Sequence, residues 1–400
     1  MGNVLVIKNM LLFFYVAFLT STLSNAGVSI SVSLLCLCLL YAYHKKRNIV
    51  YPDRYFVIIY GIFFCSLFIA AFILGDMQSL KATSKYLYWS LPFWVVYSAG
   101  CISFSPKAWG YAMCISMLTL SLYSAYLFLV NPFGTRITSF FASGNGLAGV
   151  LEIVIPFLIA FIVISYKNGY KKYIRYLIIV VAILTIFALI ASQSRGGIAG
   201  WILGGIFVLV IRFKYSQAFK GKFIVLKNTL CISILVFALC SVSFLGLSIF
   251  QRGYDNERIL MIQSSYEMWN DHKVCGVGFA NWKEYYRNEY VSPMAKEPHV
   301  PMPHNNIAFF FSTTGIIGGI GYSIFVLGMI ILLIQKIRSN PSNWCYQAAL
   351  WSFVAISIHG LVDSGITNKY NMQILCMCLG IAFSSDKILD MASDVEKTYL

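Results

Sequence analysis

Charged residues are scarce in this sequence of 400 residues. Asp, Glu, Lys and Arg together make up 11% of it, whereas apolar residues make up 59% and aromatic residues 16%. Roughly a quarter of the residues in a soluble domain are charged, so this composition excludes an ordinary soluble protein. Repeated apolar runs of about 20 residues, the length that crosses a bilayer, predict instead an all-α, polytopic integral membrane protein.

Motifs for nucleotide chemistry, disulfide scaffolds and zinc ribbons are also missing. The sequence has no Walker motif and no glycine-rich nucleotide loop, which disfavours an energy-coupled pump, and no Ser-His-Asp signature. It has 11 cysteines but no Cys-x-x-Cys pair, so neither a disulfide framework nor a zinc ribbon is indicated. All of them except Cys275 fall in or beside apolar runs, where cysteine behaves as a small hydrophobe.

The charges that are present are mostly basic and give a net charge of +15. A nucleic-acid surface needs a continuous basic face, but these Lys and Arg residues lie in short breaks between apolar runs, as topogenic signals do. The breaks separate about 12 predicted transmembrane helices, at residues 10–23, 28–43, 55–74, 86–104, 108–130, 146–166, 174–192, 197–212, 224–250, 305–335, 345–361 and 372–384. Residues 24–26 faintly resemble a signal-peptide cleavage site, but we expect the first span to be retained.

The basic breaks fall on one side of the membrane if both termini are cytoplasmic. The chain then divides into nine transmembrane helices in residues 1–250, a periplasmic loop at 251–304, and three more helices with a cytoplasmic tail in 305–400. Inside the loop, residues 256–271 predict a short amphipathic helix near the membrane surface. Its apolar positions are Ile259, Ile262, Tyr266 and Trp269.

Three arginines lie in outer segments of this topology. Arg195 occupies a short polar turn between two apolar runs, Arg258 begins the amphipathic segment, and Arg136 lies in the loop at 131–145. An arginine at the depth of Arg195 either snorkels to the interface or meets an anion. Guanidinium groups bind phosphate oxygens in bidentate fashion, so several converging arginines suit a diphosphate. The glycines that follow Arg195 would let such an anion approach the backbone.

His304 stands behind a Pro-Met-Pro segment at the start of an apolar helix. The prolines restrict how the chain enters the helix, and Asn305 or Asn306 is suited to cap it. A histidine held there can act as a general base near neutral pH; the alternative is an interfacial histidine with one backbone hydrogen bond. Glu297, His299 and His304 offer zinc ligands, but their spacing fits no standard motif.

Two carboxylates are expected near the outer ends of their helices. They are Glu152 and Asp363, with His359 one helical turn before Asp363. Carboxylates in such positions are functional candidates, and we expect these two to support the site by pairing with the arginines. Further candidates for substrate contact come from the same outer segments: Arg136, Asn145, Lys81, Lys85 and Asn305.

Four segments together resemble the O-antigen ligase and polymerase superfamily. They are "RITSFFASGNGLAGVLEIVIP" at 136–156, "IASQSRGGIAGW" at 190–201, "NERILMIQSSYEMWNDHKVCGVG" at 256–278 and "HNNIAFFFSTTGIIGGIG" at 304–321. The resemblance implies a bacterial inner-membrane enzyme with a periplasmic active site that moves O-antigen polysaccharide from undecaprenyl diphosphate to lipid A-core. It also implies that Arg195 and Arg258 hold the diphosphate, that His304 is the base, and that neither metal nor nucleotide is needed.

Other functions remain open at this point. An O-antigen polymerase of the same superfamily shares the donor chemistry; the chain size and the modest outer loop favour a ligase. A protein-directed oligosaccharyltransferase of the superfamily usually carries an extra outer domain, which does not appear in this sequence. A lipid-linked oligosaccharide transporter would need charged residues at mid-membrane depth, whereas the candidates here crowd the outer edge.

Overall fold

The computed structural model describes residues 51–102, 105–132, 134–215, 254–363 and 365–385, together with five positions between 30 and 40. The predicted spans at 10–23 and 224–250, and most of the span at 28–43, lie outside the described residues. Within the described residues the protein is helical and contains no strand.

The helices follow the predicted apolar runs closely. They are α3 (Arg54–Leu74), α4 (Met77–Ile102), α5 (Pro106–Val130), α6 (Gly144–Lys167), α7 (Lys172–Ala191), α8 (Arg195–Tyr215), α10 (Tyr254–Asp271), α11 (Trp282–Tyr285), α12 (Asn306–Ser339), α13 (Trp344–His359) and α14 (Lys369–Ser384). Among the described residues, six helices are long and apolar enough to cross a membrane: α3, α5, α6, α7, α8 and α12. The all-α, multi-pass architecture is therefore confirmed, whereas the count of 12 spans stays a prediction.

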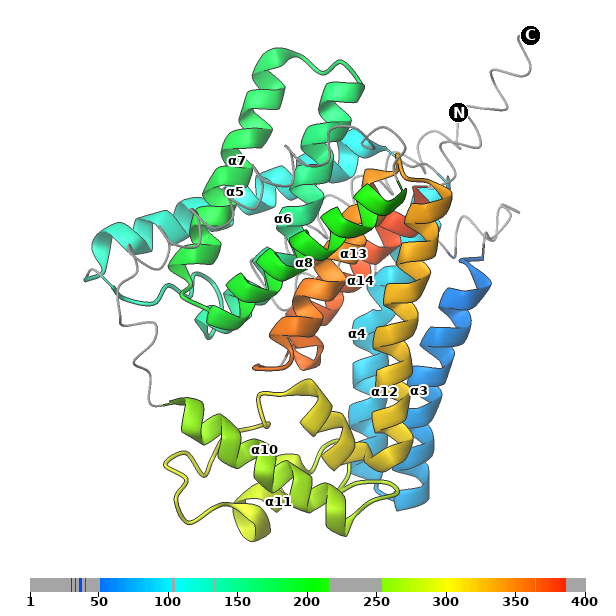
Figure 1. Ribbon diagram of the computed structural model, residues 1–400, viewed down its shortest axis with the longest axis vertical. Coiled ribbons are helices and arrows are strands. Elements are labelled where there is room, and N and C mark those ends of the chain that lie inside the picture. Colours follow the sequence, from blue (N-terminus) through cyan, green and yellow to red (C-terminus); the bar gives the residue numbers. More distant parts are fainter. Residues whose placement is uncertain are drawn as a thin grey trace.

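Helix α6 forms the centre of the bundle. Its residues from Leu147 to Leu158 are buried without interruption, because α6 packs against α7, α13 and α14. Figure 1 shows α3, α4 and the long part of α12 side by side, with α10 and α11 gathered at one end of these helices. Helix α8 lies along α13. The polar loop predicted from the sequence is thus a folded cap at one end of the bundle.

The start of α4 corrects one prediction. The span was expected at 86–104, but the helix begins at Met77. The Asp76 carboxylate accepts hydrogen bonds from the backbone amides of Gln78 and Ser79, each at 3.0 Å, and so caps a helix that starts well before the apolar run. Lys81 and Lys85 therefore lie on helical turns and not in a loop.

Helix α12 differs from the single span predicted at 305–335. It breaks at Gly315, which has φ 61° and ψ −159°, a conformation open mainly to glycine. The segment after α10 bonds into the break: the Ile316 amide donates to the Lys273 carbonyl at 2.8 Å, and the Val277 amide donates to the Ser312 carbonyl at 2.9 Å. A Cβ atom at Gly315 would lie 2.2 Å from the Val274 carbonyl oxygen. The break therefore ties the outer cap to the membrane bundle.

The predicted helix at 256–271 is present as α10. Its buried face carries Glu257, Met261, Ser264, Ser265 and Met268. Three of the four apolar positions named from the sequence, Ile259, Ile262 and Tyr266, are exposed on the opposite side. An exposed apolar stripe is what a helix at a membrane surface presents; its contact with lipid stays a prediction.

Candidate active site

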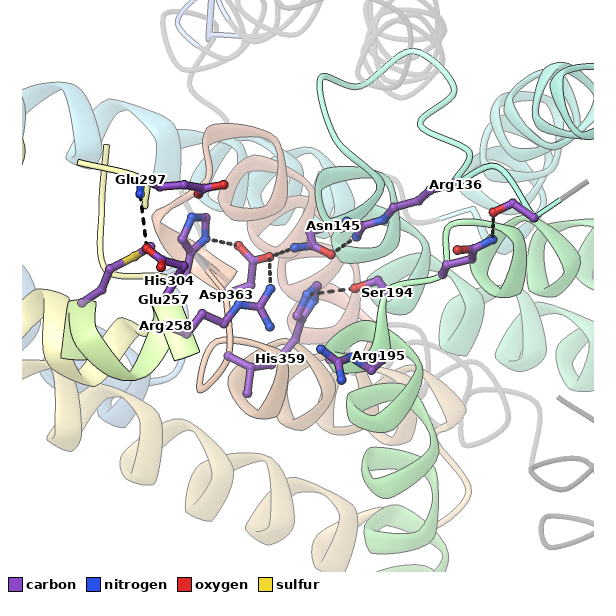
Figure 2. A pocket seen from close by; sticks show the side chains of 15 residues that line it. Arg136, Asn145, Ser194, Arg195, Glu257, Arg258, Glu297, His304, His359 and Asp363 are labelled. Atoms are coloured by element: carbon purple, nitrogen blue, oxygen red, sulfur yellow. Dashed lines mark hydrogen bonds and ion pairs between the residues drawn. The ribbon is translucent and has the colours of Figure 1, made fainter. Parts of the chain in front are cut away.

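A cavity of about 620 Å³ opens where the outer cap meets the bundle. Its wall comes from five places: the segment that leads into α6, the start of α8, the start of α10, the segment before α12, and the end of α13 with the chain that follows it (Figure 2). The lining residues are Gly134, Arg136, Asn145, Gln193, Ser194, Arg195, Gly196, Glu257, Arg258, Met261, Glu297, His304, His359, Val362 and Asp363.

All three arginines singled out from the sequence line this cavity. Arg195 is the first residue of α8, so the positive end of that helix dipole adds to its charge. Arg258 lies on the first turns of α10, with its Nη2 4.0 Å from Asp363 Oδ2. Arg136 donates from Nε to the Ser192 carbonyl at 2.8 Å. The fold therefore concentrates positive charge from three separate segments in one place.

His304 faces the same cavity. Its Nδ1 lies 3.1 Å from Asp363 Oδ1, which favours the tautomer in which Nδ1 carries the proton and Nε2 keeps a free lone pair. The backbone of His304 is left-handed, with φ 50°, a conformation that costs a non-glycine residue about 1–3 kcal/mol. Directly after it, the Asn305 side chain caps α12 by accepting from the Ala308 amide at 2.9 Å. The expected cap and the proline-guided approach thus fix where the imidazole lies.

Asp363 connects His304 to the rest of the cavity. Besides meeting His304 and Arg258, its carboxylate accepts a hydrogen bond from the Asn145 amide. Asn145 in turn accepts one from Arg136. Figure 2 shows this chain running from Arg136 through Asn145 and Asp363 to His304. The pairing of Asp363 with an arginine agrees with the expectation from the sequence, and Arg136 and Asn145 are joined to the same network.

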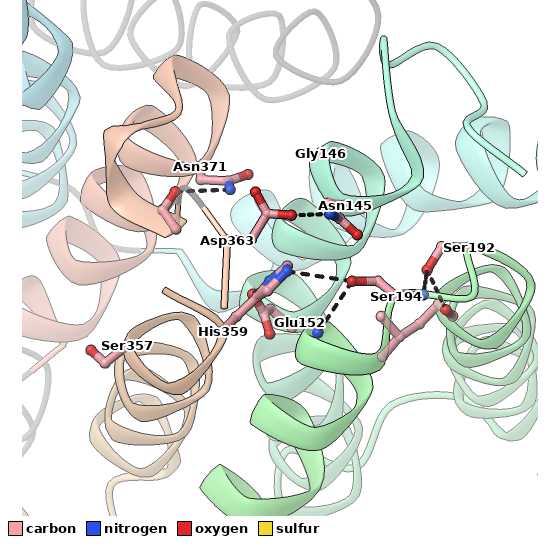
Figure 3. Close-up of polar contacts among 12 residues, drawn as sticks. Asn145, Gly146, Glu152, Ser192, Ser194, Ser357, His359, Asp363 and Asn371 are labelled. Atoms are coloured by element: carbon pink, nitrogen blue, oxygen red, sulfur yellow. Dashed lines mark hydrogen bonds and ion pairs between the residues drawn. The ribbon is translucent and has the colours of Figure 1, made fainter. Parts of the chain in front are cut away.

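The expectation for Glu152 was wrong. Among the described residues, its partner is His359 and not an arginine, with Nδ1 2.7 Å from Oε1 and both side chains buried. The other ring nitrogen of His359 lies 3.4 Å from the Ser194 hydroxyl (Figure 3). The sequence placed Glu152 near the outer end of its helix, but only packing decides which side of α6 faces α13.

Three candidates for substrate contact do not line the cavity. Lys81 and Lys85 are exposed on the first turns of α4. Partial burial lowers the pKa of Lys369, and the nearby charge of Lys85 lowers it further. The Asn305 side chain is used in capping and donates to the Leu361 carbonyl at 2.8 Å. These positions follow from the early start of α4 and from the tight entry into α12.

Sequence reasoning missed one glutamate of the cavity wall, Glu257, and considered Glu297 only as a zinc ligand. The buried Glu257 carboxylate accepts from the Lys296 amide at 3.0 and 3.1 Å and from the Glu297 amide at 3.3 Å. It thereby holds the proline-rich segment that leads to His304 against α10. The sequence analysis singled out the neighbouring Arg258. A sequence does not show from which distant backbone amides a glutamate accepts hydrogen bonds.

The zinc arrangement considered from the sequence is not assembled. Within the described residues, no group of three or more His, Cys, Asp or Glu side chains converges in the way a metal ion requires. His299 is exposed and does not line the cavity. Of the three residues proposed as ligands, only Glu297 and His304 belong to the wall.

Comparison with known proteins gives one family. Residues 180–323 match the family model described as O-antigen ligase, a stretch that begins in α7, ends in α12 and contains Arg195, Arg258 and His304. No curated protein matched the chain. The match covers part of the chain and, together with the multi-pass helical fold, supports a relationship to the O-antigen ligase/polymerase superfamily.

Proposed function

We propose that this protein is an O-antigen ligase, a glycosyltransferase that moves O-antigen polysaccharide from undecaprenyl diphosphate to lipid A-core at the periplasmic face of the bacterial inner membrane. One observation carries the proposal: three arginines and one histidine from four segments line a single cavity at an end of the helical bundle. That combination fits a reaction with an anionic leaving group and a hydroxyl nucleophile.

The arginines suit the leaving group. In the transfer, the bond between the anomeric carbon and the diphosphate oxygen breaks, and the lipid diphosphate leaves with the electron pair. Negative charge grows on its oxygens as the bond lengthens. Arg195 and Arg258 can bind those oxygens through two N–H groups each, and binding that strengthens with the growing charge lowers the barrier. The amide end of α8 lies at the same wall and acts in the same direction.

His304 suits the nucleophile. Its free Nε2 accepts the proton from a hydroxyl of the acceptor sugar while the hydroxyl oxygen attacks the anomeric carbon. The Asp363 carboxylate, 3.1 Å from Nδ1, orients the ring and stabilises the imidazolium that forms, as the carboxylate does in a Ser-His-Asp triad. Arg258 binds donor and contacts Asp363, so one residue links the two halves of the reaction.

The orientation rests on the charge pattern of the sequence. Reporter domains fused after Lys46, Lys172 and Lys222 should be cytoplasmic, and one inserted within 281–296 should be periplasmic. Helices α10 and α11 lie at one end of α3, α4 and α12 (Figure 1), and the first turns of α10 line the cavity, so the loop and the cavity lie on the same side. A cytoplasmic reporter in the cap, or a periplasmic one after Lys172, would move the site to the wrong side and overturn the proposal.

A polymerase of the same superfamily is the nearest alternative, because it uses the same donor chemistry. The lipopolysaccharide of a deletion strain separates the two. Loss of all long chains with accumulation of lipid-linked polymer indicates a ligase, whereas core capped with a single repeat indicates a polymerase. A lipid-linked oligosaccharide transporter is less well supported, because the cationic groups gather at the end of the bundle beside the cap. In the transporter case, purified protein would not join donor to acceptor.

A further inference from the structure

A second histidine, His359, lines the cavity but has no part in the reaction as proposed. It ends α13 and is paired with Glu152 of α6, and both side chains are buried. Its Nε2 faces the Ser194 hydroxyl at 3.4 Å. That hydroxyl also accepts from the Gly197 amide at 3.3 Å, which is the capping contact of α8. One imidazole therefore joins α6 and α13 to the first turn of α8.

The glycines after Arg195 leave room for this ring. A Cβ atom at Gly196 would lie 2.7 Å from His359 Cδ2, and one at Gly197 would lie 3.5 Å from Cε1. One turn further on, a Cβ atom at Gly200 would lie 2.4 Å from the Ala355 carbonyl oxygen. The sequence suggested that the glycines let an anion approach. The structure shows that their open side is occupied by Ala148 of α6, by the end of α13 and by Val362 after it, so the first turn of α8 packs against His359.

We propose that the Glu152–His359 pair is a positioning unit for the donor diphosphate. It sets the direction of the first turn of α8, and so the place of Arg195 over the cavity. This inference rests on the proposed function, because the diphosphate is the ligand that Arg195 would hold. His359 is a positioning residue and acts through Ser194 and α8.

The polar pair fixes the orientation of the His359 ring, which an apolar side chain of the same size could not do for the Ser194 contact. The bond from Nδ1 to Glu152, 2.7 Å long, fixes the rotation of the ring, just as an outer carboxylate fixes a metal-bound histidine. With the ring fixed, Nε2 points at Ser194 (Figure 3). An apolar replacement would fill the space but leave the capping hydroxyl without its second partner, and the first turn of α8 would lose its fixed direction.

The test compares donor and acceptor kinetics in purified, reconstituted protein. His359→Leu and Glu152→Leu should raise the KM for the lipid-diphosphate donor about tenfold, the lower end of what an outer orienting partner contributes. Their kcat and their KM for the acceptor should stay within about threefold of the wild type, because His304 and Asp363 are untouched. Glu152→Gln keeps an oxygen for Nδ1–H and should restore most of the donor affinity.

A matched control is Ser357→Ala on the same helix, whose hydroxyl donates to the Phe353 carbonyl of its own helix at 2.7 Å. It should leave both KM values unchanged. Equilibrium binding of undecaprenyl diphosphate, measured without acceptor, gives a readout independent of turnover and should show the same tenfold loss. If the leucine variants do not fold, Ser194→Ala removes the contact from the α8 side. It should lower the affinity for the donor by a smaller factor and leave the KM for the acceptor unchanged.

The outcomes separate the two proposals. Wild-type protein that binds no lipid diphosphate contradicts the proposed function itself. If the wild type binds it and the His359, Glu152 and Ser194 variants bind it equally well, only the positioning role is wrong. An equal rise in KM for donor and acceptor, or a fall in kcat with both KM values unchanged, would also overturn the positioning role.

Discussion

Two histidine–carboxylate pairs lie at the same cavity, and they differ mainly in their access to solvent. In the pair of His304 and Asp363 the side chains are 29% and 6% exposed, whereas in the pair of His359 and Glu152 they are 2% and 0% exposed. The distances are similar, at 3.1 and 2.7 Å. A general base must reach the proton that it removes, so exposure and not pairing favours His304 over His359 as the base in the proposed reaction.

The backbone around the two histidines also differs. His304 follows a proline-rich segment, has a left-handed backbone and precedes a broken helix. His359 ends a regular helix and packs on glycines. Backbone strain held in place by neighbouring structure is common at functional sites. The comparison suggests that the fold holds the reactive pair in a strained position and uses the relaxed pair as a fixed support.

The largest expected effect comes from the arginines. Arg258 contacts Asp363 of the exposed pair, and Arg195 follows Ser194, which faces His359 of the buried pair. Arg195→Ala and Arg258→Ala should each abolish measurable transfer while the protein still folds and inserts, because each removes a charged fork from the diphosphate. Lysine at either position should rescue only partly, since it lacks bidentate geometry. The measurement is transfer by purified protein. Near-normal activity in both alanine variants would place the diphosphate elsewhere.

Asp363→Asn should have a smaller effect and tests the exposed pair directly. Asparagine keeps the size of the side chain but cannot stabilise an imidazolium, so we expect kcat to fall about a hundredfold, within the range for impaired general-base catalysis. Donor binding should fall less, because the arginines that would hold the diphosphate are unchanged. An Asn variant with normal kcat would show that His304 does not gain positive charge during the reaction.

The smallest effect should come from His299 and from chelation. His299→Ala should be mild, because the side chain is exposed and lies outside the cavity wall. We also expect EDTA to leave transfer unchanged in a reconstituted assay. A zinc mechanism predicts the opposite for both: His299→Ala would be as damaging as His304→Ala, and chelation would stop the reaction.

Helices and arginines were the parts of this structure that the sequence could predict. Long apolar runs leave little choice but helix in a membrane protein, and charge placement put Arg195, Arg258 and His304 on one side. Apolar runs and charge placement predict how far along its helix a residue lies, but not the rotation of the helix about its axis. For that reason the partner of Glu152 was predicted wrongly, and the role of Glu257 in holding residues 296 and 297 was missed.

Local backbone features explain the other differences. Asp76 starts α4 early and removes Lys81 and Lys85 from the expected loop. Gly315 breaks α12, yet the surrounding sequence is apolar and rich in glycine throughout, so nothing marked this glycine over its neighbours. The break depends on the segment at 273–278, which bonds into it from another part of the chain.

The most direct test of this account is the transfer rate of His304→Ala measured together with its affinity for the lipid-diphosphate donor. We predict a rate about a hundred- to ten-thousand-fold below the wild type, the usual loss for a missing general base. Donor affinity should be nearly unchanged, because the arginines still hold the diphosphate. Retention of a near-normal rate, or a loss of donor binding as large as the loss of rate, would contradict the assignment of His304 as the base.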